Sequence, residues 1–167
     1  MAVSAYEVIS TQTLGSAVQT VTLSSIPATY TDLVVVVNAQ ASQQSDLFLT
    51  FNGDTSALYS NTILYGDGTS IGSRRDSRGN AYMVLTYYGA VTTTAGASVH
   101  TVKIMNYSNT TTHKTVLSRC SAGAAGVDAS VGLWGSTAAI TSITFDIPST
   151  RTFSTGSTFT LYGIKAA

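Results

Sequence analysis

Apolar and polar residues alternate in two neighbouring segments near the end of the chain. Ile143, Phe145 and Ile147 alternate with polar residues in the first segment, and Phe159 and Leu161 do so in the second. Successive side chains of a β-strand point to opposite faces, so this period of two predicts strands with one buried face. Threonine and serine fill most of the outward positions. Threonine suits a pleated surface packed against neighbours, so these outer faces can contact other protein as readily as water.

Similar strand patterns run along the whole chain, and no apolar stripe with a helical period interrupts them. The predicted strands span residues 6–11, 18–24, 32–39, 47–52, 61–65, 81–88, 99–105, 114–120, 130–134, 141–147 and 158–164. Asn52-Gly53 and Asp67-Gly68 are dipeptides typical of tight turns between strands. Short, evenly spaced strands favour an all-β fold, and we predict a single-domain antiparallel β-sandwich of the jelly-roll type over residues 1–167, with a short N-terminal arm at about 1–5.

Two segments stand out from the simple alternation. Residues 33–37 are apolar at every position, which predicts a central strand covered on both faces. Residues 121–127 are all small apart from a final valine. They predict a flexible loop or, equally, a contact where a neighbouring backbone approaches closely.

Charge is scarce in this chain. Charged residues make up 10% of the sequence, and eight basic residues balance eight acidic ones, giving a formal net charge of zero. Such a chain has no overall field to attract nucleic acid or an anionic membrane, so neither is expected as a partner. Low net charge also favours association, which a protein that is part of an assembly tolerates well.

The single cysteine and the N-terminal segment predict a protein that is made and kept in a reducing compartment. Cys120 is the single cysteine, so an internal disulfide and a multi-thiolate metal site are excluded, and a small buried side chain is expected. No basic segment followed by an apolar core precedes Glu7, so we expect no secretory signal. Neither a cofactor nor a metal is predicted.

The residues that most often perform catalysis form no recognisable signature. His100 shares a strand face with Val102 and predicts a partly buried structural histidine, whereas His113 lies in a polar, turn-like segment. Nucleophile-elbow, phosphate-loop and zinc-protease motifs are absent from the sequence. The aspartates are dispersed and mostly adjoin turn residues, although Asp54 and Asp67 would converge if the segment between them folded back, as a calcium or glycosidase site requires. The sequence therefore favours a protein without enzymatic activity.

The candidate contact residues are a cluster of arginines and three aromatic residues. The arginines Arg74, Arg75 and Arg78 surround Asp76 in what reads as a loop tip. This tip is either a solvated hairpin end that keeps a sheet edge from pairing with other strands or a basic contact surface that binds an acidic partner. Tyr and Trp are frequent anchors of interfaces and sugar platforms, and the candidates here are Tyr87, Tyr88 and Trp134. For Trp134, core packing is the favoured interpretation.

Several segments together resemble a family of small virion structural proteins of tailed bacteriophages. These segments are 25–33 (SIPATYTDL), 51–55 (FNGDT) with 59–60 (YS), 64–68 (LYGDG), 132–134 (GLW), 138–144 (AAITSIT) and 156–164 (GSTFTLYGI). The similarity runs from about residue 6 to residue 164. The motifs are specific as a set, although each alone is only a turn beside a strand.

The resemblance implies a non-enzymatic β-sandwich module displayed on the virion. The first expectation is a head decoration (cement) protein, a homotrimer that binds the major capsid protein on the outer head surface, is assembled in the host cytoplasm and is released by lysis. The alternative is a tail or fibre tip that binds host surface carbohydrate through Trp134, Tyr87 and Tyr88. Glycan hydrolysis is a third possibility, which requires two carboxylates facing each other across a cleft.

Overall fold

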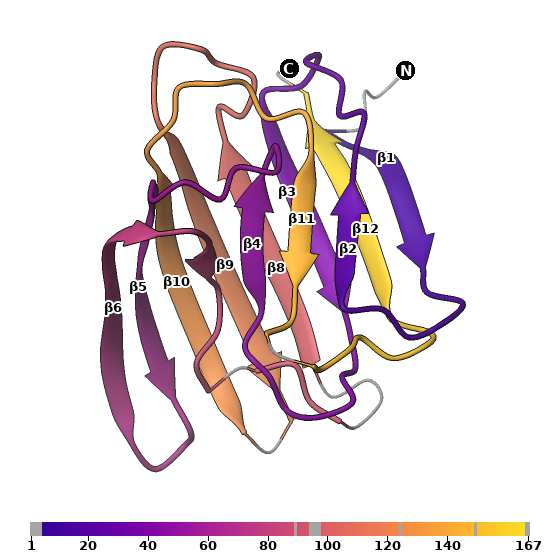
Figure 1. Cartoon of the computed structure of the whole chain (residues 1–167), viewed down its shortest axis with the longest axis vertical. Helices are drawn as coiled ribbons and strands as arrows, with labels where there is room; N and C mark the ends of the chain where they lie inside the picture. Colours follow the sequence, from indigo (N-terminus) through magenta and orange to yellow (C-terminus); the bar gives the residue numbers. More distant parts are fainter. Residues whose placement is uncertain (1–4, 89, 94–97, 124, 149, 166–167) are drawn as a thin grey trace.

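The protein folds as two antiparallel β-sheets packed face to face, as the computed structural model in Figure 1 shows. The structure describes residues 5–88, 90–93, 98–123, 125–148 and 150–165, so residues 1–4 of the expected N-terminal arm lie outside the described part. The strands in this part are β1 (Tyr6–Thr13), β2 (Thr20–Leu23), β3 (Asp32–Asn38), β4 (Phe48–Phe51), β5 (Tyr59–Gly66), β6 (Ile71–Asn80), β7 (Met83–Val84), β8 (Ser98–Met105), β9 (Lys114–Ala122), β10 (Gly126–Trp134), β11 (Ile143–Asp146) and β12 (Thr158–Ile164).

The strand order is that of a jelly roll with an addition. The large sheet has the order β1-β12-β3-β8-β9-β10-β5-β6, and the small sheet has the order β2-β11-β4-β7. When the β5–β6 and β9–β10 hairpins are set aside, eight strands remain. Their orders are first-eighth-third-sixth in one sheet and second-seventh-fourth-fifth in the other, which is the jelly-roll arrangement. The all-β, jelly-roll-like sandwich predicted from the sequence is therefore confirmed.

The two added hairpins form one structural unit on the edge of the jelly roll. β10 pairs with β9 on one side and with β5 on the other, so the hairpins join into four neighbouring strands that lengthen the large sheet. We call β9, β10, β5 and β6 the extension. In Figure 1 it lies to the left of the small sheet, and β6 forms its free edge.

The hydrophobic core lies between the two sheets. Leu33, Val35 and Val37 of β3 are fully buried and pack in one cluster with Phe145 of β11 and Phe159 of β12. These residues occupy alternate strand positions, as the period of two requires. β3 lies between β12 and β8, so the strand predicted at 33–37 is central as expected. Only one of its faces packs against the small sheet, and Val36 on the opposite face is partly exposed, so the expected cover on both faces is wrong.

Glycine allows the extension to pack closely at two points. A side chain at Gly132 of β10 would overlap Met83 of β7, so its absence lets Met83 lie directly on the β10 backbone. Gly126 has a positive φ of 147°, and a Cβ there would approach the carbonyl oxygen of Gly66 to 2.5 Å. The small residues at 121–127 therefore serve in part for a close backbone approach, one of the two alternatives. The predicted loop is shorter than expected, because β9 continues to Ala122 and β10 begins at Gly126.

Two further strand predictions need correction. The predicted strand 81–88 pairs as a strand only over Met83–Val84. Beyond it, the Leu85 amide still donates to the Leu47 carbonyl, and side chains then take over: the Thr86 hydroxyl accepts from the Leu47 amide, and Asp128 accepts from the Tyr87 and Tyr88 amides. The arginine-rich segment, predicted as a loop tip, is part of β6 and pairs with β5 over most of its length.

Candidate functional site

The extension carries the residues that the sequence marked as candidate contacts, but it divides them between its two faces. Side chains at 72, 74 and 76 of β6 point toward the small-sheet side, and those at 71, 73, 75 and 77 point away from it. Arg74 and Arg75 therefore lie on opposite faces of the sheet. Arg78 belongs to the same strand, and its side chain lies outside the described part of the structure.

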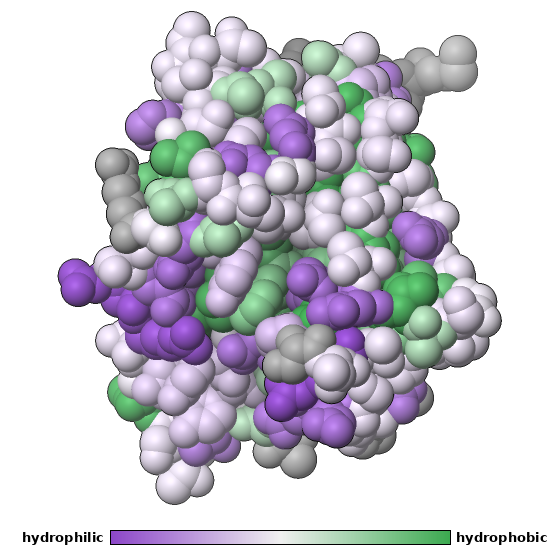
Figure 2. Space-filling model, viewed as in Figure 1, coloured by the Kyte–Doolittle hydropathy of each residue, from purple (hydrophilic) through white to green (hydrophobic). Residues whose placement is uncertain are grey.

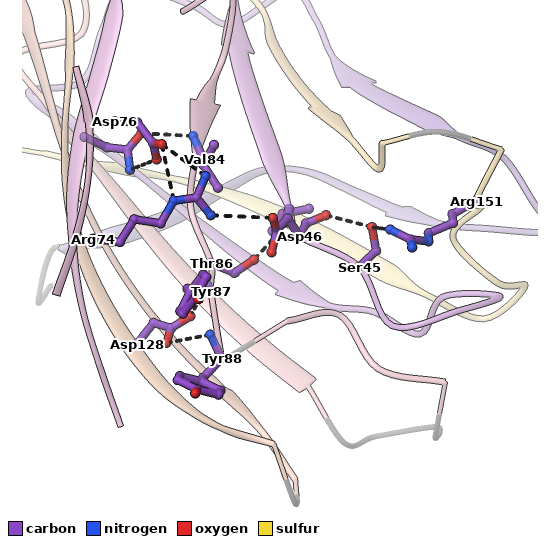
Figure 3. Close-up of polar contacts among 12 residues, drawn as sticks. Ser45, Asp46, Arg74, Asp76, Val84, Thr86, Tyr87, Tyr88, Asp128 and Arg151 are labelled. Atoms are coloured by element: carbon purple, nitrogen blue, oxygen red, sulfur yellow. Dashed lines mark hydrogen bonds and ion pairs between the residues drawn. The ribbon is translucent and has the colours of Figure 1, made fainter. Parts of the chain in front are cut away.

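Arg74 joins two carboxylates on the inner face of the extension (Figure 3). Its Nη2 lies 3.0 Å from Asp76 Oδ1, and its Nη1 lies 3.9 Å from Asp46 Oδ2. The guanidinium carbon also lies 5.4 Å from the ring centroid of Tyr87, within the range of a cation–π contact. We call Asp46, Arg74, Asp76 and Tyr87 the Arg74 cluster.

A buried carboxylate holds the tyrosines beside this cluster. Asp128 of β10 is only 4% exposed and accepts hydrogen bonds from the Tyr87 amide at 2.5 Å and the Tyr88 amide at 3.1 Å. The Tyr65 ring packs against both tyrosines, with centroid distances of 4.6 and 5.0 Å. Tyr87 remains 42% exposed. One edge of the molecule thus presents an aromatic ring next to an arginine and two carboxylates.

A shallow hollow of about 250 Å³ adjoins the Arg74 cluster. Its lining consists of Gln44, Ser45, Asp46, Tyr87, Ala90 and Arg151. Burial raises the pKa of Asp46 above its ordinary value, while the nearby Arg74 opposes part of this rise. Figure 2 shows hydrophilic residues gathered over the β5–β6 side of this face. The groups present can form hydrogen bonds to a polar ligand that stacks on Tyr87.

The outer face of the extension has a different character. In this face Leu64, Val127, Val131 and Leu117 remain about half exposed, and Ile71 is 93% exposed. Strand register places Val131 between Thr62 and Leu117, and Leu64 next to Ala129. Apart from Arg75 and Arg119, the outer face is therefore a surface of aliphatic, threonine and serine side chains, more apolar than a typical solvated sheet face.

Three adjoining hollows roughen this outer face. The largest, of about 690 Å³, lies among Leu64, Gly66, Ile71 and Val127. A second, of about 300 Å³, is lined by Thr62, Arg75 and Val131 among others. A third, of about 380 Å³, includes Val99, Arg119 and Val127. The missing side chain at Gly66, which would lie beside Ile71, deepens the first hollow.

Trp134 is not a surface contact, which corrects its place among the candidates. It is 2% exposed, and its ring lies 5.4 Å from that of Phe51 and 6.3 Å from that of Tyr59. Its indole nitrogen donates to Asp54 Oδ2 at 2.7 Å. Since the inner face of β10 is covered by the small sheet, the residue on that face packs in the core while Val131, on the opposite face, stays exposed.

Asp54 and Asp67 do not converge. β5 separates them and pairs antiparallel with β10, so Asp54 lies near Trp134 at one end of β10 while Asp67 follows Gly66, opposite Val127 at the other end. A strand of this length spans about 25 Å. Asp67 instead accepts hydrogen bonds from the Thr69 and Ser70 amides, as an ordinary turn aspartate does.

His100 and Cys120 are buried next to each other on β8 and β9, as their register shows. Burial lowers the pKa of His100 to about 4, and neither ring nitrogen has a hydrogen-bond partner within the described structure. Burial, with a smaller contribution from Asp128, raises the pKa of the Cys120 thiol. Both agree with the structural roles expected from the sequence. The described residues contain no group of three or more His, Cys, Asp or Glu side chains able to hold a metal ion.

Sequence reasoning missed the two most informative carboxylates. Asp46 and Asp128 were grouped with turn aspartates, yet the structure places Asp128 on the inner face of β10 and Asp46 beside Arg74. A signal was available for Asp128, since Ser130 and Gly132 share its strand face and are also small or polar. These small residues leave space for the segment above them, with Met83 over Gly132 and Tyr88 over Gly126.

Comparisons with known proteins reveal only distant likenesses. Neither a protein-family model nor a curated protein matches the sequence. Among solved structures, a Caenorhabditis elegans galectin, LEC-6, has a TM-score of 0.37 at 6% identity and covers 93% of this chain and 96% of its own. An alginate lyase, Aly36B, has a TM-score of 0.33 at 10% identity and covers 92% and 77%. A toad ovary galectin in complex with thio-digalactose has a TM-score of 0.30 at 12% identity and covers 78% and 100%. At these scores the neighbours do not bear on the function of this chain.

In the part of the chain that the structure describes, no helix has the length and apolar character needed to cross a membrane.

Proposed function

We propose that this protein is a non-enzymatic structural protein of a tailed-bacteriophage virion, a capsid decoration (cement) protein that binds the outer head surface and stabilises the shell. The resemblance of its strand and turn motifs to small virion proteins of these phages supports this proposal. The observation that carries it is the outer face of the extension, where exposed aliphatic side chains replace the charged groups of an ordinary solvated sheet. Such a face is suited to lasting contact with other protein.

The same proposal accounts for how modest contacts could stabilise a shell. Each copy offers a small apolar face, and a homotrimer would present three such faces to neighbouring capsid subunits. Binding through several linked contacts exceeds the affinity of any one contact, because the later contacts form within one complex. The major capsid protein is the partner in this scheme.

The polar side chains described above fit a structural role. Asp46 and Asp76 both contact Arg74, so the two carboxylates flank a cation and do not face each other across an open cleft. Asp128 holds backbone amides, and Asp54 holds the Trp134 indole. Each of these carboxylates is explained by a contact that supports the fold.

The proposal is tested by adding the purified protein to phage heads that lack it. We expect saturable binding at symmetry-related head positions and a rise in the temperature at which the heads release their DNA. Bovine serum albumin at equal concentration serves as the control for non-specific protection. Absence of binding to heads, with the melting temperature unchanged, would contradict the proposal.

A second candidate is a tail or fibre tip module that binds host surface carbohydrate. The observation that favours it is the exposed Tyr87 ring beside the polar hollow of Ser45, Asp46 and Arg151. Aromatic rings stack on sugar faces, and polar groups beside them bind hydroxyls. A glycan array with the wild-type protein and Tyr87→Ala tests it. Specific binding that the variant loses supports this candidate, and an array without specific signal removes it.

A further inference from the structure

We propose that the outer face of the extension is the attachment surface, and that its partner is a protein surface of the phage head that combines apolar side chains with carboxylates. This inference rests on the proposed function and adds which face binds and what chemistry it binds.

Apolar side chains run across neighbouring strands of this face. Register places Leu117, Val131 and Thr62 side by side on β9, β10 and β5, and the next strand position of each carries Arg119, Ala129 and Leu64. Ile71 and Val127 complete the face near the hairpin turns. A patch that spans neighbouring strands without a charged residue at its centre resembles the core of a protein interface.

The charge around this patch is positive. Arg75 on β6 and Arg119 on β9 flank it, and neither guanidinium has an ion pair or hydrogen bond within the described residues. By contrast, Lys103 on β8 is already paired with Asp32 at 3.3 Å. The described outward positions of β5, β6, β9 and β10 carry no aspartate or glutamate. Two unpaired arginines around an apolar centre fit a partner that brings carboxylates to the rim.

A second copy of this chain does not fit this face as the occupant. If two copies paired through the same face, each would bring Arg75 and Arg119 toward the other copy, and neither would supply a carboxylate from this face. Self-complementary pairing would therefore oppose like charges across the interface. The trimer contacts of the proposed function must lie elsewhere on the molecule.

The three hollows complete the description of the partner. They adjoin one another between the ridges formed by Leu64, Val127 and Val131. A grooved surface of this kind gains most contact area from protruding side chains that fill the hollows. The partner surface is accordingly expected to be convex and aliphatic at its centre.

The test uses the full chain and heads that lack it. The charge variant is Arg75→Gln with Arg119→Gln, and its matched control is Gln12→Glu with Gln43→Glu, which changes the net charge by the same amount at exposed positions away from this face. The apolar variant is Leu64→Ser with Val131→Thr. Circular dichroism melting and sedimentation of every variant verify the fold and oligomeric state.

We expect the charge variant to bind heads at least about tenfold more weakly and with a smaller dependence on salt, because it lacks the steering and rim charges. The apolar variant should lose binding at all salt concentrations, and the control should bind like the wild type. If the wild type binds heads and both variants bind as well as it does, the assignment of this face is overturned but the proposed function is not. Failure of the wild type itself to bind would overturn the proposed function, and the inference with it. Loss of binding together with dissociation of the oligomer would identify the face as a contact between copies and also overturn the inference.

Discussion

His100 shows how a single buried side chain can set the acid stability of this protein. It is 1% exposed, and its pKa is lowered to about 4 because burial disfavours the charged form. In the unfolded chain an ordinary histidine titrates near pH 6.5. Between pH 6.5 and about pH 4, the unfolded state therefore binds a proton that the folded state does not bind. The free energy of unfolding falls as the pH falls through this window.

We predict that His100 costs the wild-type protein about 3 kcal/mol of unfolding free energy between pH 7 and pH 4, since each pKa unit corresponds to about 1.4 kcal/mol. The measurement is urea unfolding at a series of pH values for wild type and His100→Leu. The variant should lack this part of the pH dependence, whereas His113→Leu, at an exposed position, should keep it. Identical pH profiles for wild type and His100→Leu would show that the histidine is not buried neutral.

Lys114 is a second residue whose burial has a measurable consequence. Its side chain is buried, and its Nζ donates to the carbonyl oxygens of Asn109, Thr112 and Thr137 at 2.6 to 3.1 Å. Burial lowers the pKa of Lys114 from its ordinary value. The ammonium ties the turn before β9 to the segment after β10.

Lys114→Met should lower the free energy of unfolding by about 2 kcal/mol, because three part-buried hydrogen bonds from a charged donor are lost. The matched control is Lys103→Met on the neighbouring strand, where an exposed ion pair is worth about 0–1 kcal/mol. Both values follow from urea unfolding at pH 7. Equal losses in the two variants would contradict the structural role assigned to Lys114.

At the scale of elements, Asp128 anchors the segment after β7 to the extension. β7 ends at Val84, and the Leu85 amide still donates to the Leu47 carbonyl. The Tyr87 and Tyr88 amides that follow donate to the Asp128 carboxylate (Figure 3). The exposed Tyr87 ring and the Arg74 cluster are positioned by this link.

We predict that Asp128→Ala lowers the free energy of unfolding by about 3 kcal/mol, because two amides in a part-buried position lose a charged acceptor. Amide hydrogen exchange at Tyr87 and Tyr88 should accelerate beyond the global change. Asp67→Ala is the control, since Asp67 also accepts from two amides but in an exposed turn, where about 1 kcal/mol is expected. Unchanged exchange at the two tyrosines would refute the anchoring role.

The strands that the sequence predicted well are those with one buried face. β11 and β12 carry aliphatic or aromatic side chains at alternate positions, and β3 carries them throughout 33–37; the predicted and observed ends of all three strands agree to within two residues. β6 was missed because an edge strand of the extension has neither face in the main core, so Gly, Ser and Arg occupy it without an apolar period. The Asp67-Gly68 turn was the usable signal, since a tight turn after a long strand implies a partner of similar length.

The candidate site was predicted in part for the same reason. Sequence pattern identified the arginines and tyrosines by type, and alternation along β6 separates Arg74 from Arg75 once the strand is known. The burial of Trp134 depends on which face of β10 the small sheet covers, and local pattern does not contain that information. The partners of Asp46 and Asp128 come from segments distant in sequence, so only the fold could bring them together.

At the scale of the whole molecule, the jelly roll and the extension have separate tasks. The eight jelly-roll strands supply most of the hydrophobic core, to which the extension adds Tyr59, Val116 and Trp134. The extension continues one sheet past the small sheet's edge (Figure 1). The extension thereby presents one apolar face outward and one polar, aromatic edge inward. The proposed attachment to a phage head uses the outward face.

The most direct test of this account is cryo-electron microscopy of heads after addition of the protein. The account predicts ordered density at symmetry-related positions on the head, with the outer face of β9, β10, β5 and β6 against the shell and Arg75 and Arg119 near capsid carboxylates. Bare heads, or decorated heads in which this face points to solvent, would contradict it.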